Sequence, residues 1–348
     1  MKSRPAPVYS SPIGIELRGR WMKAAQRTRA GWTSVRVHRE VVAGPHEWCP
    51  TQADISRLAE CIHAAGIVGH EAVLGAPSAT LLSQSLELPP RSSGAPIDAS
   101  ATAELARASR FESSTIEAAV WDTPGGSRAN ASSVLVMGLD HPTASELLAL
   151  FRSTPLDIVA IDAAPAAIGR TPEGSRPGAH AFVDLGWDDS VLSIFLNGLP
   201  IYQRRLDDGG LSAAYLDISA RDQVGRDAID AVLLPSGLAD PEVATVRAAL
   251  LAGWRGSVAR VIDPLATELE RSLSYASLRF PSSPLLSVSI CGDGAPLPGL
   301  LERLQTRIPS VPVATVPEAA FAVARGLALW NARLTARGSP LPAGKEAA

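Results

Sequence analysis

Residues 181–210 read AFVDLGWDDSVLSIFLNGLPIYQRRLDDGG and decide the fold of the chain. The first apolar run of this stretch ends at Asp184 and is broken by Gly186. A second apolar run and a third lie on either side of the pair Asn197-Gly198. Asn-Gly between apolar runs is a strong signal for a two-residue hairpin turn, because both residues tolerate a positive φ. The stretch therefore predicts a three-stranded meander with an acid at its first turn.

The same pattern occurs near the start of the chain, in residues 13–42. A short apolar strand carries Glu16, residues 18–20 make a polar turn, and a second strand leads to a turn at Ala30-Gly31. The separation of Glu16 from Gly31 nearly equals that of Asp184 from Gly198. The chain therefore looks duplicated, with two halves about half a chain length apart.

The composition limits the classes of function. The chain has 348 residues, 46% of them hydrophobic, and a net charge of -3, which fits two domains or one two-lobed fold. Its basic residues are scattered, which argues against a nucleic-acid partner. The three cysteines show no CxxC spacing, which is typical of a reduced, cytoplasmic protein. No apolar segment reaches membrane-spanning length, so membrane contact is expected only through partners.

The rest of the chain divides around the two meanders. An amphipathic helix over 52–65 and a strand over 71–75 complete a β-β-β-α-β lobe. An inserted α+β subdomain is expected next, with residues 158–162 as its last strand, and Asp263-Pro264 is expected to begin a helix. The predicted first lobe consists of residues 12–75 and 163–180 and is closed by a C-terminal helix at 317–330, and the inserted subdomain consists of residues 76–162. The predicted second lobe consists of residues 181–316, with a helical subdomain at 211–284. A flexible tail is expected at 331–348.

Two hairpins that each carry an acid predict a cleft in which both turns face one ligand. Tight turns expose backbone N–H groups that suit phosphate, and a nearby carboxylate can hold Mg²⁺ through water. The loop Gly292-Asp293-Gly294, between a strand and a helix, adds a third place where a ligand can approach the backbone. The sequence shows no paired histidine ligands of the HExxH type and no GxSxG nucleophile turn, so no catalytic residue is identified.

These motifs resemble the actin-like ATPase superfamily and, within it, the PilM family of type IV pilus assembly proteins, which is related to the FtsA division proteins. IGIELRGRWMK at 13–23 and VDLGWDDSVLSIFLNG at 183–198 are similar to the two phosphate motifs. CGDGAPLPGL at 291–300 resembles the adenosine motif. Further similar stretches are LELPP at 86–90, LATELERSLSYA at 265–276 and ARGLAL at 324–329. The resemblance implies a two-lobed α/β fold of the actin-like ATPase type, with duplicated lobes and a small α+β subdomain inserted in the first.

The resemblance also implies ligands and partners. ATP and Mg²⁺ would bind between the lobes, with Asp184 and Glu16 organising the metal. The expected nucleotide-binding residues are Lys23, Asp184, Gly186, Gly209, Gly210, Arg271, Gly292, Asp293 and Gly294. The expected partners are the N-terminal peptide of a PilN-like inner-membrane protein and the pilus motor ATPase. The protein would be cytoplasmic and peripheral to the inner membrane through these partners.

The first phosphate motif departs from the family pattern. The family has Asp and then Gly two residues later, where this chain has Glu16 and Arg18. Arg at a turn position that needs positive φ costs about 1–2 kcal/mol, unless Gly19 takes that position. The Arg18 side chain could fill the phosphate space or pair with a phosphate. We therefore expect a degraded ATP site in a scaffold without efficient turnover.

Several alternatives stay open at this point. Asp188 and Asp189 are expected to be exposed turn residues, and Lys23 is either a phosphate ligand or a solvated edge residue. Glu16 and Arg18 could form a plain surface pair. A sugar-kinase-like phosphotransferase and an FtsA-like division protein are the rival functions, and the second is disfavoured because the tail lacks an apolar face.

Overall fold

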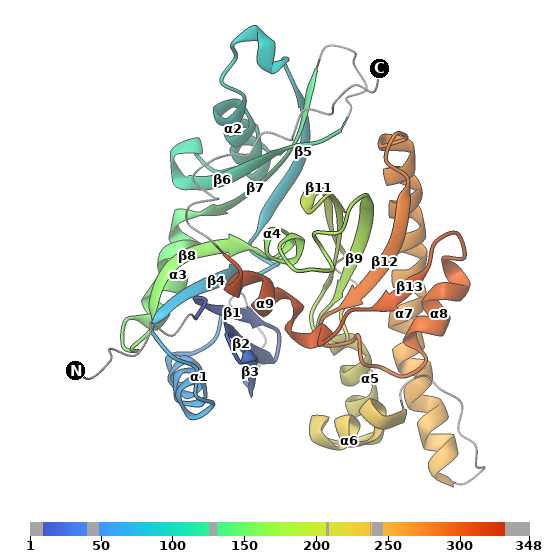
Figure 1. Ribbon diagram of the computed structural model, residues 1–348. Helices are drawn as coiled ribbons and strands as arrows, with labels where there is room; N and C mark the ends of the chain where they lie inside the picture. Colours follow the sequence, from blue (N-terminus) through green and yellow to red (C-terminus); the bar gives the residue numbers. More distant parts are fainter. Residues whose placement is uncertain are drawn as a thin grey trace.

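The computed structural model describes residues 10–39, 49–124, 131–206, 209–236, 238 and 246–330, and the expected tail at 331–348 lies outside these residues. It contains two five-stranded sheets and a three-stranded sheet, each with helices packed on it (Figure 1). The three-stranded sheet lies at the top of the view, the first lobe at the lower left and the second lobe on the right.

The sheet of the first lobe has the order β3-β2-β1-β4-β8. Its strands are β1 (Ile13–Arg18), β2 (Trp21–Thr28), β3 (Gly31–His38), β4 (Glu71–Ala76) and β8 (Asp157–Ala163). The first three strands form the expected antiparallel meander, and β4 and β8 are added in parallel. The crossover helix α1 (Gln52–Ala64) begins at Thr51, whose hydroxyl accepts the backbone N–H of Asp54 at 3.2 Å in a capping box.

The sheet of the second lobe repeats this arrangement in the order β11-β10-β9-β12-β13. Its strands are β9 (Ala179–Leu185), β10 (Ser190–Leu196), β11 (Leu199–Leu206), β12 (Leu285–Cys291) and β13 (Val313–Thr315). The turn between β10 and β11 has φ of 52° at Asn197 and 84° at Gly198, as the Asn-Gly pair predicts. The two sheets therefore match strand for strand, which confirms the duplication.

Helices lie to the right of the sheet of the second lobe and below it (Figure 1). They are α5 (Ser212–Asp222), α6 (Arg226–Ser236), α7 (Val246–Arg279) and α8 (Leu300–Arg307). The prediction that a helix begins at Asp263-Pro264 is wrong, because α7 runs through both residues. Asp263 cannot act as an N-cap there, since its carboxylate instead accepts two hydrogen bonds from Arg303 at 2.7 and 2.6 Å.

The inserted subdomain consists of a small sheet and one helix. The sheet has the order β5-β7-β6, with β5 (Leu82–Leu88), β6 (Ile116–Asp122) and β7 (Ser132–Asp140). Helix α2 (Ile97–Ser109) covers one face and forms a separate core with it, and the short 3₁₀ helices η1 (Arg91–Ser93) and η2 (Ser113–Thr115) lie in its loops.

The insertion ends earlier than the expected boundary at residue 162. Strand β8 pairs with β4 in the sheet of the first lobe, with Leu74 opposite Ile161. Helix α3 (His141–Phe151) contributes Leu147 and Phe151 to the core of the first lobe. The residues next to β8 in the sequence suggested that it belongs to the insertion, whereas its partner β4 lies before the whole of the insertion.

The end of the described chain packs on the first lobe. Helix α4 (Ala164–Gly169) contacts α9 (Ala322–Ala328), which is preceded by η4 (Ala319–Phe321) and is shorter than the expected helix at 317–330. A Cβ at Gly14 would lie 2.0 Å from the carbonyl oxygen of Ala324, so only glycine allows β1 to approach α9 this closely. In the described part of the chain, no helix has the length and apolarity needed to cross a bilayer.

Candidate functional site

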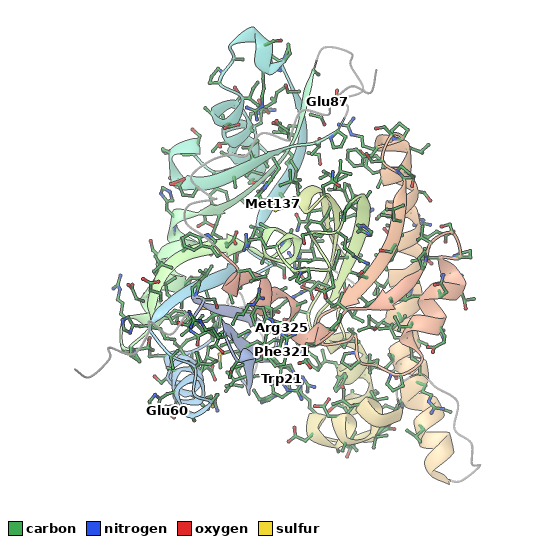
Figure 2. All side chains as sticks on the ribbon, in the orientation of Figure 1. Trp21, Glu60, Glu87, Met137, Phe321 and Arg325 are labelled. Atoms are coloured by element: carbon green, nitrogen blue, oxygen red, sulfur yellow. The ribbon has the colours of Figure 1, made fainter. Side chains whose placement is uncertain are left out.

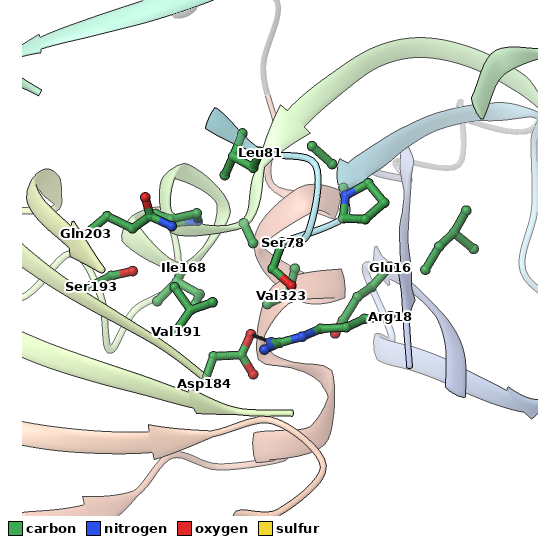
Figure 3. Close-up of a pocket in the computed structure, with 16 residues that line it drawn as sticks. Glu16, Arg18, Ser78, Leu81, Ile168, Asp184, Val191, Ser193, Gln203 and Val323 are labelled. Atoms are coloured by element: carbon green, nitrogen blue, oxygen red, sulfur yellow. Dashed lines mark hydrogen bonds and ion pairs between the residues drawn. The ribbon is translucent and has the colours of Figure 1, made fainter. Parts of the chain in front are cut away.

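Arg18 crosses from one lobe to the other at the end of β1. Its Nη1 pairs with the carboxylate of Asp184, near the end of β9. Its Nη2 donates to Oδ1 of Asp189 at 2.7 Å and to the backbone carbonyl of Asp189 at 2.8 Å. Arg18, Asp184 and Asp189 are 9%, 3% and 2% exposed, so both ion pairs are buried between the lobes. Figure 3 shows the pair of Arg18 with Asp184. The alternative of a plain surface pair between Glu16 and Arg18 is wrong.

Asp189 is the most heavily bonded acid of the site, and the sequence analysis placed it on the surface. Its Oδ2 accepts Nε of Arg205 at 2.6 Å, and its Oδ1 accepts the hydroxyl of Ser78 at 3.0 Å. Burial opposes ionisation of Asp189, but Arg18 and Arg205 outweigh it and hold its pKa below the ordinary value. The expectation of an exposed turn is therefore wrong for Asp189, while Asp188 is half-buried.

Near Arg18, Lys23 forms ion pairs with two further acids, Glu16 and Asp293. Its Nζ lies 3.2 Å from Oε1 of Glu16 and 2.9 Å from Oδ1 of Asp293. Lys23 is 1% exposed because β2 lies between β1 and β3, so the solvated-edge alternative is wrong. Burial raises the pKa of Glu16 to about 7, against the opposing charge of Lys23. Glu16, Lys23, Asp184 and Asp293 are thus brought together.

The buried ion cluster is already rich in negative charge. Four carboxylates are paired with three cations: Arg18 and Lys23, which are buried, and Arg205, which is 40% exposed. The members of the cluster are Glu16, Arg18, Lys23, Asp184, Asp189 and Asp293. A phosphate group entering this cluster would have to displace carboxylates from Arg18 or Lys23.

The glycines of the predicted phosphate loops are packed against protein atoms. A Cβ at Gly186 would lie 2.6 Å from Cζ of Arg18, and one at Gly292 would lie 2.3 Å from Oδ1 of Asp184. A Cβ at Gly294 would lie 2.4 Å from the Leu185 side chain, and one at Gly210 would lie 2.2 Å from the carbonyl of Asp188. These glycines let the two lobes and their loops approach each other closely.

The space left at the cluster is small. A cavity of about 20 Å³ is lined by residues of both lobes, among them Glu16, Arg18, Ser78, Asp184, Ser193 and Gln203 (Figure 3). This volume holds about one water molecule.

The residues of the cluster do not fit Mg²⁺ and ATP, which this fold family implies. Oε2 of Glu16 and Oδ1 of Asp184 have no hydrogen-bond partner among the described residues, and carboxylate oxygens are donors that Mg²⁺ accepts. However, Arg18 stands at Asp184, and the described residues contain no group of three or more acidic, histidine or cysteine side chains that could hold a metal ion.

Two predicted nucleotide-binding residues line a groove beside the cluster, and Arg205, which donates to Asp189, lines it too. Gly209 and Arg271 line an open groove of about 460 Å³ between β11 and α7. The Arg271 side chain is 71% exposed and pairs with Glu268 at 2.8 Å. This groove is bounded by the second lobe only.

A second contact between the lobes involves Arg20 and was missed by the sequence analysis. Its Nη2 donates to both carboxylate oxygens of Asp230 at 2.7 Å, and its guanidinium lies 4.3 Å from the ring centre of Trp187. Gly19 has a φ of 55°, and a Cβ there would lie 2.5 Å from Cβ of Trp187. The only sequence signal was two arginines on either side of a glycine in a hairpin turn.

A separate groove lies between the inserted subdomain and the first lobe. It has a volume of about 420 Å³, and β6, β7, β8 and α3 line it. Its apolar residues include Leu81, Trp121, Met137 and Ile161, and Figure 2 labels Met137 between the small sheet and the first lobe. Ala119 of β6 is exposed in this groove.

Comparisons with known proteins give the fold. The chain is similar to a solved chain of a PilM–PilN type IV pilus biogenesis complex, with a TM-score of 0.71, 16% identity and coverage of 92% of this chain and 98% of that one. It is also similar to the ethanolamine utilization protein EutJ of Carboxydothermus hydrogenoformans, with a TM-score of 0.54, 12% identity and coverage of 94% and 92%. The chain has the actin-like ATPase fold. This confirms the fold class expected from the sequence, while no protein-family model and no curated protein matches the chain.

Proposed function

We propose that the chain is a cytoplasmic scaffold of a type IV pilus platform, or of a related secretion machine, that binds the N-terminal peptide of a PilN-like inner-membrane protein. The observation that carries this proposal is the likeness to a chain of the PilM–PilN complex, which extends over 92% of this chain. The inserted subdomain lies within that span and supplies a groove, as the binding of a peptide requires.

The groove between the inserted subdomain and the first lobe suits an extended peptide. Leu81 and Trp121, which are half-buried, offer apolar contacts for side chains of one face of a peptide, while Met137 lines the groove but is only 2% exposed. Strand β6 has a strand partner on one side only among the described residues, so its other edge can pair with an added strand. We place the PilN-like peptide here.

Binding of a synthetic peptide to the full chain tests this proposal by calorimetry. The peptide is the N-terminal segment of the PilN-like protein encoded by the same organism. Ala119→Arg puts a long charged side chain in the groove and is expected to weaken binding by about tenfold or more. Ala103→Arg, at an exposed position of α2, is the control and should leave the affinity unchanged.

Each outcome of this titration is informative. Absence of binding to the unchanged chain would contradict the scaffold proposal, and equal weakening by both variants would move the peptide away from the groove. The rival of a sugar-kinase-like phosphotransferase predicts steady ATP turnover when sugars are added. Contact with the motor ATPase is a further expectation, which mixing of the two purified proteins would test.

A further inference from the structure

We propose that Arg18 takes the place of the nucleotide: its guanidinium bridges the two lobes, and the chain keeps its cleft closed without binding Mg²⁺ and ATP there. The proposal concerns the chain alone and does not depend on the peptide partner. It is carried by three independent features of the ion cluster.

The first feature is that the loop amides are already used. Phosphate sites in loops need free backbone N–H donors. The N–H of Gly186 donates to the carbonyl of Asp189 at 3.1 Å, and that of Gly294 donates to the carbonyl of Leu185 at 3.0 Å. The N–H of Gly292 donates to the carbonyl of Ala319 at 2.9 Å. These three glycine amides are therefore committed to the protein itself.

The second feature is the position of the guanidinium. It lies against Gly186, where a Cβ would be 2.6 Å from Cζ, and it contacts Asp184 and Asp189 on both sides of that glycine. Arg18 thus lies, from the first lobe, against both ends of the turn between β9 and β10. A triphosphate reaching this turn would have to expel a buried side chain.

The third feature is charge. A triphosphate would bring further negative charge to four carboxylates, and the cations that face them, Arg18, Lys23 and Arg205, are already paired. The carboxylate of Asp189 also accepts the hydroxyl of Ser78, in the loop between β4 and β5, so it is held by two residues across the cleft. The contacts that close the cleft are therefore all made within the chain.

Titration of the full chain with Mg²⁺ and ATP is the test. We expect no heat of binding and no rise in melting temperature at millimolar ATP for the unchanged chain. Arg18→Gly, alone and with Glu16→Asp, restores the residue types of the family motif and is expected to gain measurable ATP binding. Arg20→Ala is the matched control, because it removes a buried arginine between the lobes but leaves the Arg18 side chain against Gly186. This variant should gain no ATP binding.

Micromolar binding of ATP by the unchanged chain would overturn the proposal, as would equal gains by Arg18→Gly and Arg20→Ala. If the Arg18→Gly variants do not fold, hydrogen exchange of the unchanged chain, with and without Mg²⁺ and ATP, tests the proposal instead. We expect exchange in the turn over residues 186–189 to be unaffected by Mg²⁺ and ATP, and protection of that turn by ATP would contradict the bridge. Where Arg18→Gly folds, unchanged exchange at this turn without nucleotide would show that Arg18 does not hold the cleft closed.

Discussion

Glu16 makes stability depend on pH in an unusual direction. Burial raises its pKa from 4.5 to about 7 in the folded chain. Between these two values the folded state binds more protons than the unfolded state, so stability falls as pH rises through this window. Glu16→Gln should remove this dependence. Its size is at most about 3 kcal/mol in the free energy of unfolding, because each pKa unit corresponds to about 1.4 kcal/mol.

Urea unfolding between pH 4.5 and pH 7 checks this prediction. The control is Glu112→Gln, which changes an exposed acid and should leave the slope of stability against pH as it is. If Glu16→Gln shows the same slope of stability against pH as the unchanged chain, Glu16 is fully ionised beside Lys23.

Single residues also show how far the site could be predicted. Motif order alone indicated that Glu16, Asp184 and Asp293 would meet, and they do. The burial of Asp189 could not be predicted, because adjacent acids in a hairpin turn are ordinarily solvated. What buries Asp189 is Arg18, from a strand 171 positions earlier, and a local pattern carries no signal of such a pairing.

Pro264 lies inside the continuous helix α7, where it lacks a backbone N–H donor. Proline in a helix interior costs about 3 kcal/mol, and replacing it frees the unfolded chain by about 0.4–1 kcal/mol. Pro264→Ala should therefore stabilise the chain by about 2 kcal/mol, measured by urea unfolding. Pro309→Ala, at an exposed position between α8 and β13, is the control and should be slightly destabilising. A neutral or destabilising Pro264→Ala would show that α7 needs the proline, for example to place Asp263 against Arg303.

Elements were predicted well where the signal is local. The Asn197-Gly198 turn depends on residues next to it and was found as expected. The capping box of Thr51, seen in the structure, is equally local. Strand β8 and the continuous α7 depend on contacts with distant segments. A parallel strand pair, or a helix that continues through a proline because tertiary packing holds it, cannot be recognised from spacing alone.

At the scale of the whole molecule, the two lobes and the inserted subdomain are held to one another by separate arginines. Arg18 and Arg20 join the lobes beside the ion cluster. Arg279, the last residue of α7, reaches the inserted subdomain, where it donates to Glu87 at 2.6 Å and to the hydroxyl of Ser133 at 3.0 Å. Figure 2 labels Glu87 near the upper end of α7. Strand β11 packs against the small sheet beside this contact.

Arg279→Glu should loosen the inserted subdomain from the second lobe without unfolding either. It places two carboxylates together at a partly buried contact, so we expect faster hydrogen exchange in β5, β7 and β11 and a loss of about 1 kcal/mol in the free energy of unfolding. Exchange in β1 and β9 should be unchanged, because Arg18 still joins the lobes there. The control is Arg91→Glu, which breaks pairs with Asp98 and Asp122 inside the inserted subdomain and should leave β11 unaffected. Equal exchange in β11 for Arg279→Glu and the unchanged chain would show that strand packing alone holds the subdomain in place.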